Sequence, residues 1–148
     1  MLRLSKKADY ALISMAHLAQ KSGSSSAREI AEQYGIPVEL LAKVLQRLTQ
    51  RGLLTSQQGT RGGYQLSRSA ASISLADVIH AIDGPVTVTV CSSHADRCGQ
   101  FDTCNVRNPL RRIRTIIAAA LSGTSVLELA GEPVATDHVA LVDRPSGG

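Results

Sequence analysis

The stretch that decides the fold is Ser26–Leu66, which reads S-A-R-E-I-A-E-Q-Y-G-I-P-V-E-L-L-A-K-V-L-Q-R-L-T-Q-R-G-L-L-T-S-Q-Q-G-T-R-G-G-Y-Q-L. Ser26, with Glu29 three residues later, fits the S-x-x-E capping box that begins a helix. Gly35 is the residue type that ends one, and Pro37 suits the first turn of the next. Two helices joined by a tight glycine-containing turn form a helix-turn-helix, whose second helix can enter a DNA major groove.

A β-hairpin follows the second helix directly. Strands are expected over Leu53–Gln57 and Gly63–Leu66, joined by a loop over Gly59–Gly62 whose glycines permit positive φ. A helix-turn-helix also occurs as a plain packing unit, and a hairpin can be a solvated tip. A hairpin directly after a recognition helix is nevertheless typical of the wing of a winged helix. Arg61 at its tip is placed to reach a phosphate or the minor groove.

Helices are expected on both sides of this unit. Residues 5–21 predict a helix with Ser5 as N-cap and one apolar face, and with Asp9 in the first turn, where the helix dipole favours a carboxylate. Ser74, with a carboxylate three residues later, predicts another helix that stops at a Gly-Pro pair. We therefore expect a mainly α-helical fold with a small β-hairpin, in which residues 1–84 form a winged helix-turn-helix DNA-binding domain.

All three cysteines lie together in the next segment. Cys91–Cys104 reads C-S-S-H-A-D-R-C-G-Q-F-D-T-C, with six and then five residues between successive cysteines. Thiolates are the ligands that iron–sulfur clusters and zinc prefer. Three thiolates from one loop leave a fourth ligand to come from a nearby side chain, another subunit or solvent. We expect residues 85–104 to form a cysteine loop that binds a metal or cluster.

The chain becomes helical again after this loop. An apolar face recurs at helical spacing, with arginines on the other side: Leu110, Ile113, Ile116, Ile117, Ala120 and Leu121. The helix lies outside the compact DNA-binding unit, so a second copy of the chain is the economical partner for this face. We expect residues 105–131 to be a dimerisation helix region and residues 132–148 to be a flexible tail.

Charge and composition are compatible with a DNA-binding protein of the cytoplasm. Lys plus Arg is 16 against 12 for Asp plus Glu, giving a net charge of +4 and a pI near 9.3. No apolar run approaches the roughly 20 residues that span a membrane, and no apolar stretch of the signal-peptide kind follows the N-terminal charges. In a reducing cytosol, an odd number of clustered cysteines favours metal or redox chemistry over disulfides.

Four segments together resemble the IscR and NsrR type of bacterial transcription regulators (the Rrf2 family), which are winged-helix dimers that carry an iron–sulfur cluster. They are L-S-K-K-A-D-Y-A-L (4–12), the wing G-T-R-G-G-Y-Q-L (59–66), S-L-A-D-V-I-H-A-I-D-G-P (74–85) and the three-cysteine loop, in the family's order. The resemblance covers roughly residues 1–130. C-N-V-R-N-P-L-R-R-I (104–113) is most similar to the branch that regulates iron–sulfur cluster assembly.

The resemblance implies that Cys91, Cys98 and Cys104 hold a [2Fe-2S] or [4Fe-4S] cluster. IscR-like members place a histidine three residues after the last cysteine, but this chain has Arg107 there, and a guanidinium stays protonated and cannot ligate. NsrR-like members use an aspartate in the first helix of the partner subunit, and that position is Asp9 here. Asp9 is therefore a candidate fourth ligand, and its rivals lie in the cysteine loop: His94, Asp96 and Asp102.

Expected DNA contacts fall on the helix-turn-helix and the wing. Val38, Glu39 and Lys43 lie at the start of the second helix, where a glutamate can accept from cytosine N4 and a lysine can reach guanine or phosphate. Further DNA-binding residues are expected to be the arginines at three positions: Arg28, Arg51 and Arg61. Many family members are basic where this chain has glutamine at positions 57 and 58, and Arg51 and Arg61 are the candidates to supply that charge.

We therefore expect a homodimeric transcriptional repressor that binds double-stranded DNA at a pseudo-palindromic operator. An iron–sulfur cluster would control this binding in response to iron–sulfur status, redox stress or nitric oxide. The alternatives are a winged-helix regulator with structural zinc, or one with cluster-free redox-sensing thiols. Zinc sites usually pair cysteines two to four residues apart, and no C-x-x-C is present. An enzyme, a thiol oxidoreductase, is disfavoured because the sequence has no nucleophile–base arrangement.

Overall fold

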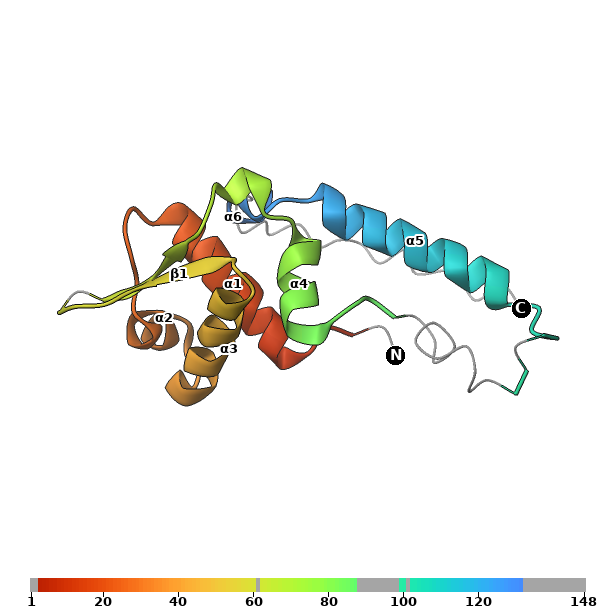
Figure 1. Cartoon of the computed structure of the whole chain (residues 1–148), viewed down its shortest axis with the longest axis horizontal. Coiled ribbons are helices and arrows are strands. Elements are labelled where there is room, and N and C mark those ends of the chain that lie inside the picture. Colours follow the sequence, from red (N-terminus) through yellow and green to blue (C-terminus); the bar gives the residue numbers. More distant parts are fainter. Residues whose placement is uncertain (1–2, 61, 88–98, 101, 132–148) are drawn as a thin grey trace, which may run out of the picture.

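The computed structural model describes residues 3–60, 62–87, 99–100 and 102–131. Within these residues, a winged helix-turn-helix unit carries a long helix that projects from it (Figure 1). The elements in chain order are α1 (Lys6–Gln20), α2 (Ala27–Tyr34), α3 (Val38–Gln50), β1 (Leu54–Gln57), β2 (Gly63–Leu66), the 3₁₀ turn η1 (Ala70–Ser72), α4 (Leu75–Asp83), α5 (Arg107–Gly123) and α6 (Val126–Gly131). The expected mainly α-helical fold with a small hairpin is confirmed.

Serine side chains begin three of the helices, as the sequence predicts. Each accepts a hydrogen bond from the backbone N–H three residues later, at 3.1, 3.1 and 3.0 Å: Ser5, Ser26 and Ser74. At α4 the capping box is complete, because the Asp77 carboxylate accepts in return from the Ser74 backbone N–H at 3.0 Å. At α2, by contrast, the Glu29 carboxylate accepts from Lys21 Nζ at 3.2 Å. Each serine satisfies an amide that the first turn leaves free, and so fixes where its helix begins.

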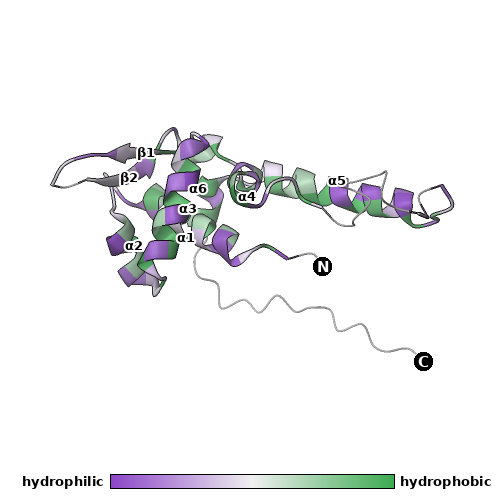
Figure 2. Ribbon diagram, turned by 60° about the horizontal axis from the view of Figure 1, so that its bottom comes forward, coloured by the Kyte–Doolittle hydropathy of each residue, from purple (hydrophilic) through white to green (hydrophobic). Residues whose placement is uncertain are grey.

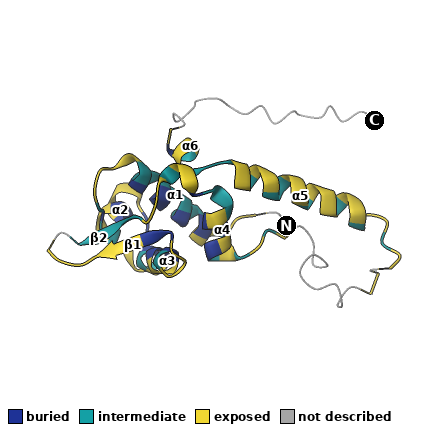
Figure 3. Ribbon diagram, turned by 45° about the horizontal axis from the view of Figure 1, so that its top comes forward, coloured by how far each residue is buried: buried dark blue, intermediate teal, exposed yellow. Residues whose placement is uncertain are grey.

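One glycine and one apolar face set the helix-turn-helix. Gly35 ends α2 with φ 65° and ψ 35°, a left-handed conformation that other residues rarely adopt. The chain turns within two residues into α3, whose apolar side is buried in the core: Leu41, Val44, Leu45 and Leu48. The opposite side of α3 therefore faces outward, as Figure 3 shows by its exposed ribbon.

The hairpin is a two-stranded antiparallel ribbon that projects from the core (Figures 1 and 2). Leu54 pairs with Leu66 at its base and Gln57 with Gly63 toward its tip. The first strand begins one residue later than expected, because the Leu53 backbone N–H donates to a carbonyl of the last turns of α3 at 3.0 Å. An isolated bridge also pairs β2 with the connection between α1 and α2.

The core of the winged-helix unit includes a helix from beyond α5. Val126 in α6 is 0% exposed and packs with the buried residues of α1, α3 and α4. Two backbone hydrogen bonds hold the start of α6: Leu75 donates to Thr124 O at 2.9 Å, and Val126 donates to Ile73 O at 2.8 Å. The Gln20 side chain donates to the Ala130 carbonyl at the other end of α6. The sequence placed this segment with the dimerisation helix region, but the structure packs it on α1.

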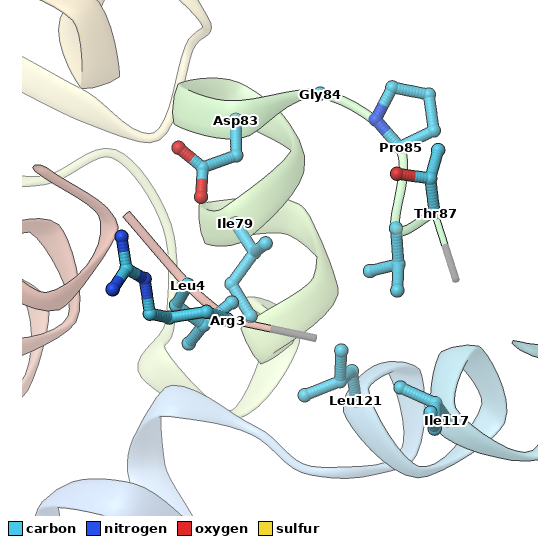
Figure 4. Close-up of a pocket in the computed structure, with 10 residues that line it drawn as sticks. Arg3, Leu4, Ile79, Asp83, Gly84, Pro85, Thr87, Ile117 and Leu121 are labelled. Carbon is cyan, nitrogen blue, oxygen red and sulfur yellow. The ribbon is translucent and has the colours of Figure 1, made fainter. Parts of the chain in front are cut away.

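Among the described residues, the main contact of the long helix α5 is with one other helix. It packs against α4, with Ile117 and Leu121 turned toward that helix (Figure 4). Two other members of the predicted apolar face are exposed, Ile113 by 44% and Ile116 by 66%. No residue of α5 is buried within the single chain. Among the described residues, no helix is long and apolar enough to cross a membrane.

Candidate nucleic-acid interface and cysteine site

The outward face of α3 carries the residues expected to read DNA bases. Val38, the first residue of α3, is 43% exposed although it is apolar. Glu39 and Lys43 are exposed one turn apart on the same face. This arrangement presents a methyl-bearing side chain, a hydrogen-bond acceptor and a cation together at the N-terminal end of α3. That is the part of a recognition helix that contacts base edges.

Two glutamines extend this face toward the wing, and the sequence reasoning missed them. Gln46 and Gln50 continue the helical stripe of Glu39 and Lys43 and are exposed. With Thr49, Ser56 and Tyr64 they line a polar groove of about 290 Å³ between α3 and the hairpin. A glutamine amide can bond to adenine in a bidentate manner. The signal that could have found them is the spacing of positions 39, 43, 46 and 50.

The expected DNA-binding arginines lie in different surroundings. Arg28 is exposed in the first turn of α2, and Arg51 is exposed at the C-cap of α3. Arg61, at the wing tip, lies outside the described residues. Arg47, on α3, is exposed, but its Nε donates to the Ala81 carbonyl of α4 at 3.2 Å. That contact ties the recognition helix to α4.

Of the three cysteines, the structure describes Cys104. It is a free, half-buried thiol in the turns that lead into α5. Cys91 and Cys98 lie outside the described residues, as do the rival ligands His94 and Asp96. In the parts of the chain that are described, no three His, Cys, Asp or Glu side chains come together in a way that could hold a metal ion.

Asp9 lies at the start of α1, well away from Cys104 in the same chain. Its carboxylate is 46% exposed and lies 3.9 Å from Lys6 Nζ. Figure 1 shows the start of α1 near the lower end of α4, whereas the turns before α5 lie at the far end of α5. Within the described residues of one chain, Asp9 and Cys104 therefore do not come together. Asp102, the remaining rival, is exposed in the turns before α5.

These donors fit an iron–sulfur cluster. The thiol of Cys104 is a soft ligand that would suit iron or zinc, and it is half-buried. The Asp9 carboxylate is 46% exposed, and its contact with Lys6 is a long ion pair at the surface, so its oxygens are accessible to a further ligand. Arg107 opens α5 as its first residue, so a cation stands where a ligand would be in IscR-like chains.

The last turn of α4 is where the segment toward the cysteines leaves the winged-helix unit. The Asp83 carboxylate accepts from the Ser5 backbone N–H at 3.0 Å and also from the Ser5 hydroxyl. Gly84 then takes φ 79° and turns the chain out of the helix. A cavity of about 440 Å³ lies between this turn, the N-terminal segment at Arg3 and the α5 side chains Ile117 and Leu121 (Figure 4).

The sequence profile of the Rrf2 family, described as iron-dependent transcriptional regulators, matches residues 4–132. The chain belongs to the Rrf2 family. A putative HTH-type transcriptional regulator of Azotobacter vinelandii is 37% identical over 99% of this chain and 90% of its own length. The HTH-type transcriptional repressor NsrR of Streptomyces coelicolor is 31% identical over 99% of this chain and all of its own length. IscR of Photorhabdus laumondii is 34% identical over 86% of this chain and 79% of its own.

Solved structures agree with this assignment. The structure of CymR, the global cysteine regulator of B. subtilis, matches with a TM-score of 0.73 and 28% identity over 88% of this chain and 97% of its own. The expected resemblance to IscR and NsrR regulators is thereby confirmed, as is the winged-helix fold. The Rrf2 protein described here is a transcriptional regulator and not an enzyme.

Proposed function

We propose that this Rrf2 protein is a cytoplasmic, homodimeric repressor whose binding to a pseudo-palindromic operator is controlled by an iron–sulfur cluster. The proposed ligands are Cys91, Cys98 and Cys104, completed by Asp9 of the partner subunit. The signal is iron–sulfur status, redox stress or nitric oxide. One observation carries the proposal: a free thiol stands at the head of α5, in a chain that the profile of iron-dependent transcriptional regulators covers almost throughout.

Double-stranded DNA is supported as the partner by the open face of α3. Val38, Glu39 and Lys43 are exposed there, and no other element of the described chain covers them. Arg28, Arg51 and Arg61 are proposed to bind phosphates on either side of this face, because arginine and lysine contacts to the backbone supply most of the affinity for DNA. Two copies related by a two-fold axis would read two half-sites about one helical turn, or a multiple of it, apart.

The homodimer is supported by the exposed side of α5. Ile113 and Ile116 are apolar, and each is more than two-fifths exposed in the single chain. Burial of such side chains stabilises an interface by roughly 25 cal/mol per Å² of apolar area. The Asp9 proposal requires that the dimer place the start of one α1 near the cysteine loop of the other chain.

Control of DNA binding follows if the loop and the DNA-binding unit prefer particular relative positions. A bound [2Fe-2S] or [4Fe-4S] cluster supplies a redox-active and oxidant-sensitive crosslink between thiolates. Without the cluster, the thiolates of Cys91, Cys98 and Cys104 would no longer hold the cysteine loop in place, and Asp9 would no longer link the partner subunit to it. DNA affinity changes only if the loaded and the cluster-free protein favour different conformations.

The test compares the two forms under strict anaerobiosis. Protein purified without oxygen is divided, one half is stripped of iron, and both are titrated with a duplex selected from a random-sequence library. The proposal predicts a brown, iron- and sulfide-containing dimer whose DNA affinity or base preference differs from that of the stripped form. Equal affinities and equal preferences would sink the switch.

Variants of the proposed ligands sharpen this test. Cys104→Ser should abolish cluster retention, and Asp9→Ala should weaken it, both measured as iron and sulfide per dimer. Glu32→Gln, an exposed carboxylate on α2, is the matched control and should retain the full content. A colourless protein with one tightly bound zinc would favour the structural-zinc alternative, and a metal-free protein that responds to oxidants would favour redox-sensing thiols.

A further inference from the structure

The wing is joined to the helix-turn-helix by five residues that take no part in the proposed ligand set. We infer that His17, Ser25 and Gly63, acting with Tyr34 and Tyr64, position the wing relative to the recognition helix and thereby set the DNA-binding geometry. These five residues are called the wing brace below. The inference rests on the DNA-binding part of the proposed function and is independent of the iron–sulfur cluster.

The first part of the brace is a pair of backbone hydrogen bonds. Ser25 N–H donates to Tyr64 O at 3.0 Å, and Tyr64 N–H donates to Ser25 O at 2.8 Å. A two-stranded ribbon alone is only marginally stable in water. The pairing with Ser25 therefore fixes β2 on the side that faces α1, while β1 is fixed by its continuation from α3.

The second part is a close approach that only glycine allows. A Cβ built on Gly63 would lie 2.6 Å from the carbonyl carbon and oxygen of Ser25 and 2.9 Å from the backbone nitrogen of Ser26. Real side chains do not approach backbone atoms so closely. Any larger residue at position 63 must therefore push β2 away from the α1–α2 connection, and the wing pivots about its base.

The third part is the imidazole of His17. Its Nε2 lies 3.2 Å from Ser25 Oγ, and its Nδ1 lies 3.0 Å from Tyr34 Oη. The rings of His17 and Tyr34 meet edge to face, with centroids 5.5 Å apart. Tyr34 is the last residue of α2, directly before the turn into α3. One side chain of α1 thus contacts both Ser25, the residue on which β2 pairs, and the end of α2 that leads to the recognition helix.

The charge state of the ring suits this role. Burial lowers the pKa of His17, the nearby Lys21 ammonium lowers it further, and the Glu29 carboxylate raises it. A neutral imidazole has one donor and one acceptor nitrogen. Both of its partners are hydroxyls, which can donate or accept, so either tautomer completes the brace. Ser25 is 1% exposed, and a buried hydroxyl without a partner is costly.

The main test replaces Gly63 and measures DNA binding. Gly63→Ala is compared with Gly131→Ala, where an added Cβ meets nothing within 4 Å. Both are titrated with a mixed-sequence DNA duplex over a series of salt concentrations. Gly63→Ala should bind DNA about tenfold more weakly. The number of counterions released on binding, read from the slope of log affinity against log salt concentration, should fall by about one because the wing loses a phosphate contact. Equal affinity and equal salt dependence in the two variants would overturn the inference.

A second measurement tests the brace without DNA. His17→Phe replaces the imidazole by an aromatic ring without nitrogens. Amide hydrogen exchange is then followed at Tyr64, whose N–H donates to the Ser25 carbonyl. The exchange should be about tenfold faster than in Gly131→Ala, because losing the hydrogen bonds of His17 to Ser25 and Tyr34 lowers the free-energy cost of local opening. Unchanged exchange at Tyr64 in both His17→Phe and Gly63→Ala contradicts the brace even if DNA binding changes. A wild-type protein that fails to bind any duplex instead contradicts the proposed function.

Discussion

Val126→Ala should destabilise the winged-helix unit, although Val126 follows the long helix α5 in the sequence. Its side chain is 0% exposed and packs in the same core as α1, α3 and α4. The neighbouring Leu127 is 51% exposed. The two positions therefore give a matched pair on one short helix, in which one side chain faces the core and the other faces solvent.

The expected size follows from the atoms removed. Val126→Ala deletes two methyl groups from a fully buried site, at about 0.8 kcal/mol for each group transferred from water. The cavity left behind adds to this, so the total loss is about 2 to 3 kcal/mol. A chain of this length loses roughly 2 to 4 °C of melting temperature per kcal/mol. The melting temperature should therefore fall by about 4 to 12 °C.

The assay is thermal and urea unfolding of both variants, followed by far-ultraviolet circular dichroism at one protein concentration. Concentration is fixed because dimerisation adds to the apparent stability. Leu127→Ala should stay within about 0.5 kcal/mol of the wild type, as surface substitutions usually do. If the two variants unfold together, α6 does not complete the core, and the winged-helix unit is already whole before α5 begins.

Two further predictions concern polar contacts of the same unit. Because the pKa of His17 is held below its usual 6.5, the unfolded chain takes up a proton that the folded chain refuses as pH falls through 6.5, so stability should decrease below that pH. In His17→Gln, the midpoint of urea unfolding should fall less steeply as the pH is lowered. An unchanged dependence of the midpoint on pH would show that other groups cause the loss of stability. Asp83→Asn should lower the free energy of unfolding by about 1 kcal/mol, because it weakens the hydrogen bonds that the N-cap residue Ser5 donates to this exposed carboxylate. Thermal unfolding measures this loss, with Glu32→Gln as the control. Equal melting temperatures of Asp83→Asn and Glu32→Gln would show that the contact between Asp83 and Ser5 does not stabilise the fold.

Local signals predicted the elements of the winged helix well. Ser5, Ser26 and Ser74 cap helices as expected, and Gly35 ends α2 in the left-handed conformation. These features depend on residues within one turn of each other, so the sequence alone determines them. The strand Gly63–Leu66 was also predicted with its observed bounds.

Contacts between distant segments were not predictable in the same way. Residues 105–131 are predicted as a dimerisation helix region, but nothing in the six residues of α6 indicates that Val126 packs on α1. The pairing of Ser25 with Tyr64 is not predictable either, because a serine in a Gly/Ser-rich stretch shows no sign of pairing with a strand that is distant in the sequence. His17 drew no attention for the same reason: its two partners are found only when α1, α2 and the wing come together.

The proposed ligands remain predictions for a related physical reason. Cys91 and Cys98 lie outside the described residues, and Asp9 and Cys104 lie apart within one chain. If the ligands are divided between two subunits, as we propose, one chain alone cannot assemble the site, because a metal site rarely exists before the metal binds.

The end of α4 contacts the DNA-binding helices and is also where the chain continues toward the proposed cysteine loop. Arg47 reaches from the recognition helix to the Ala81 carbonyl, and Asp83 holds the N-cap of α1. The chain leaves for the cysteines at Gly84, directly after these contacts. A displacement of the segment after Gly84 would therefore act on the last turn of α4, which is hydrogen-bonded to both α3 and the N-cap of α1. If a cluster controls DNA binding, these hydrogen bonds are where the two states should differ, and the weakened Asp83→Asn contact should reduce the affinity ratio between loaded and cluster-free protein.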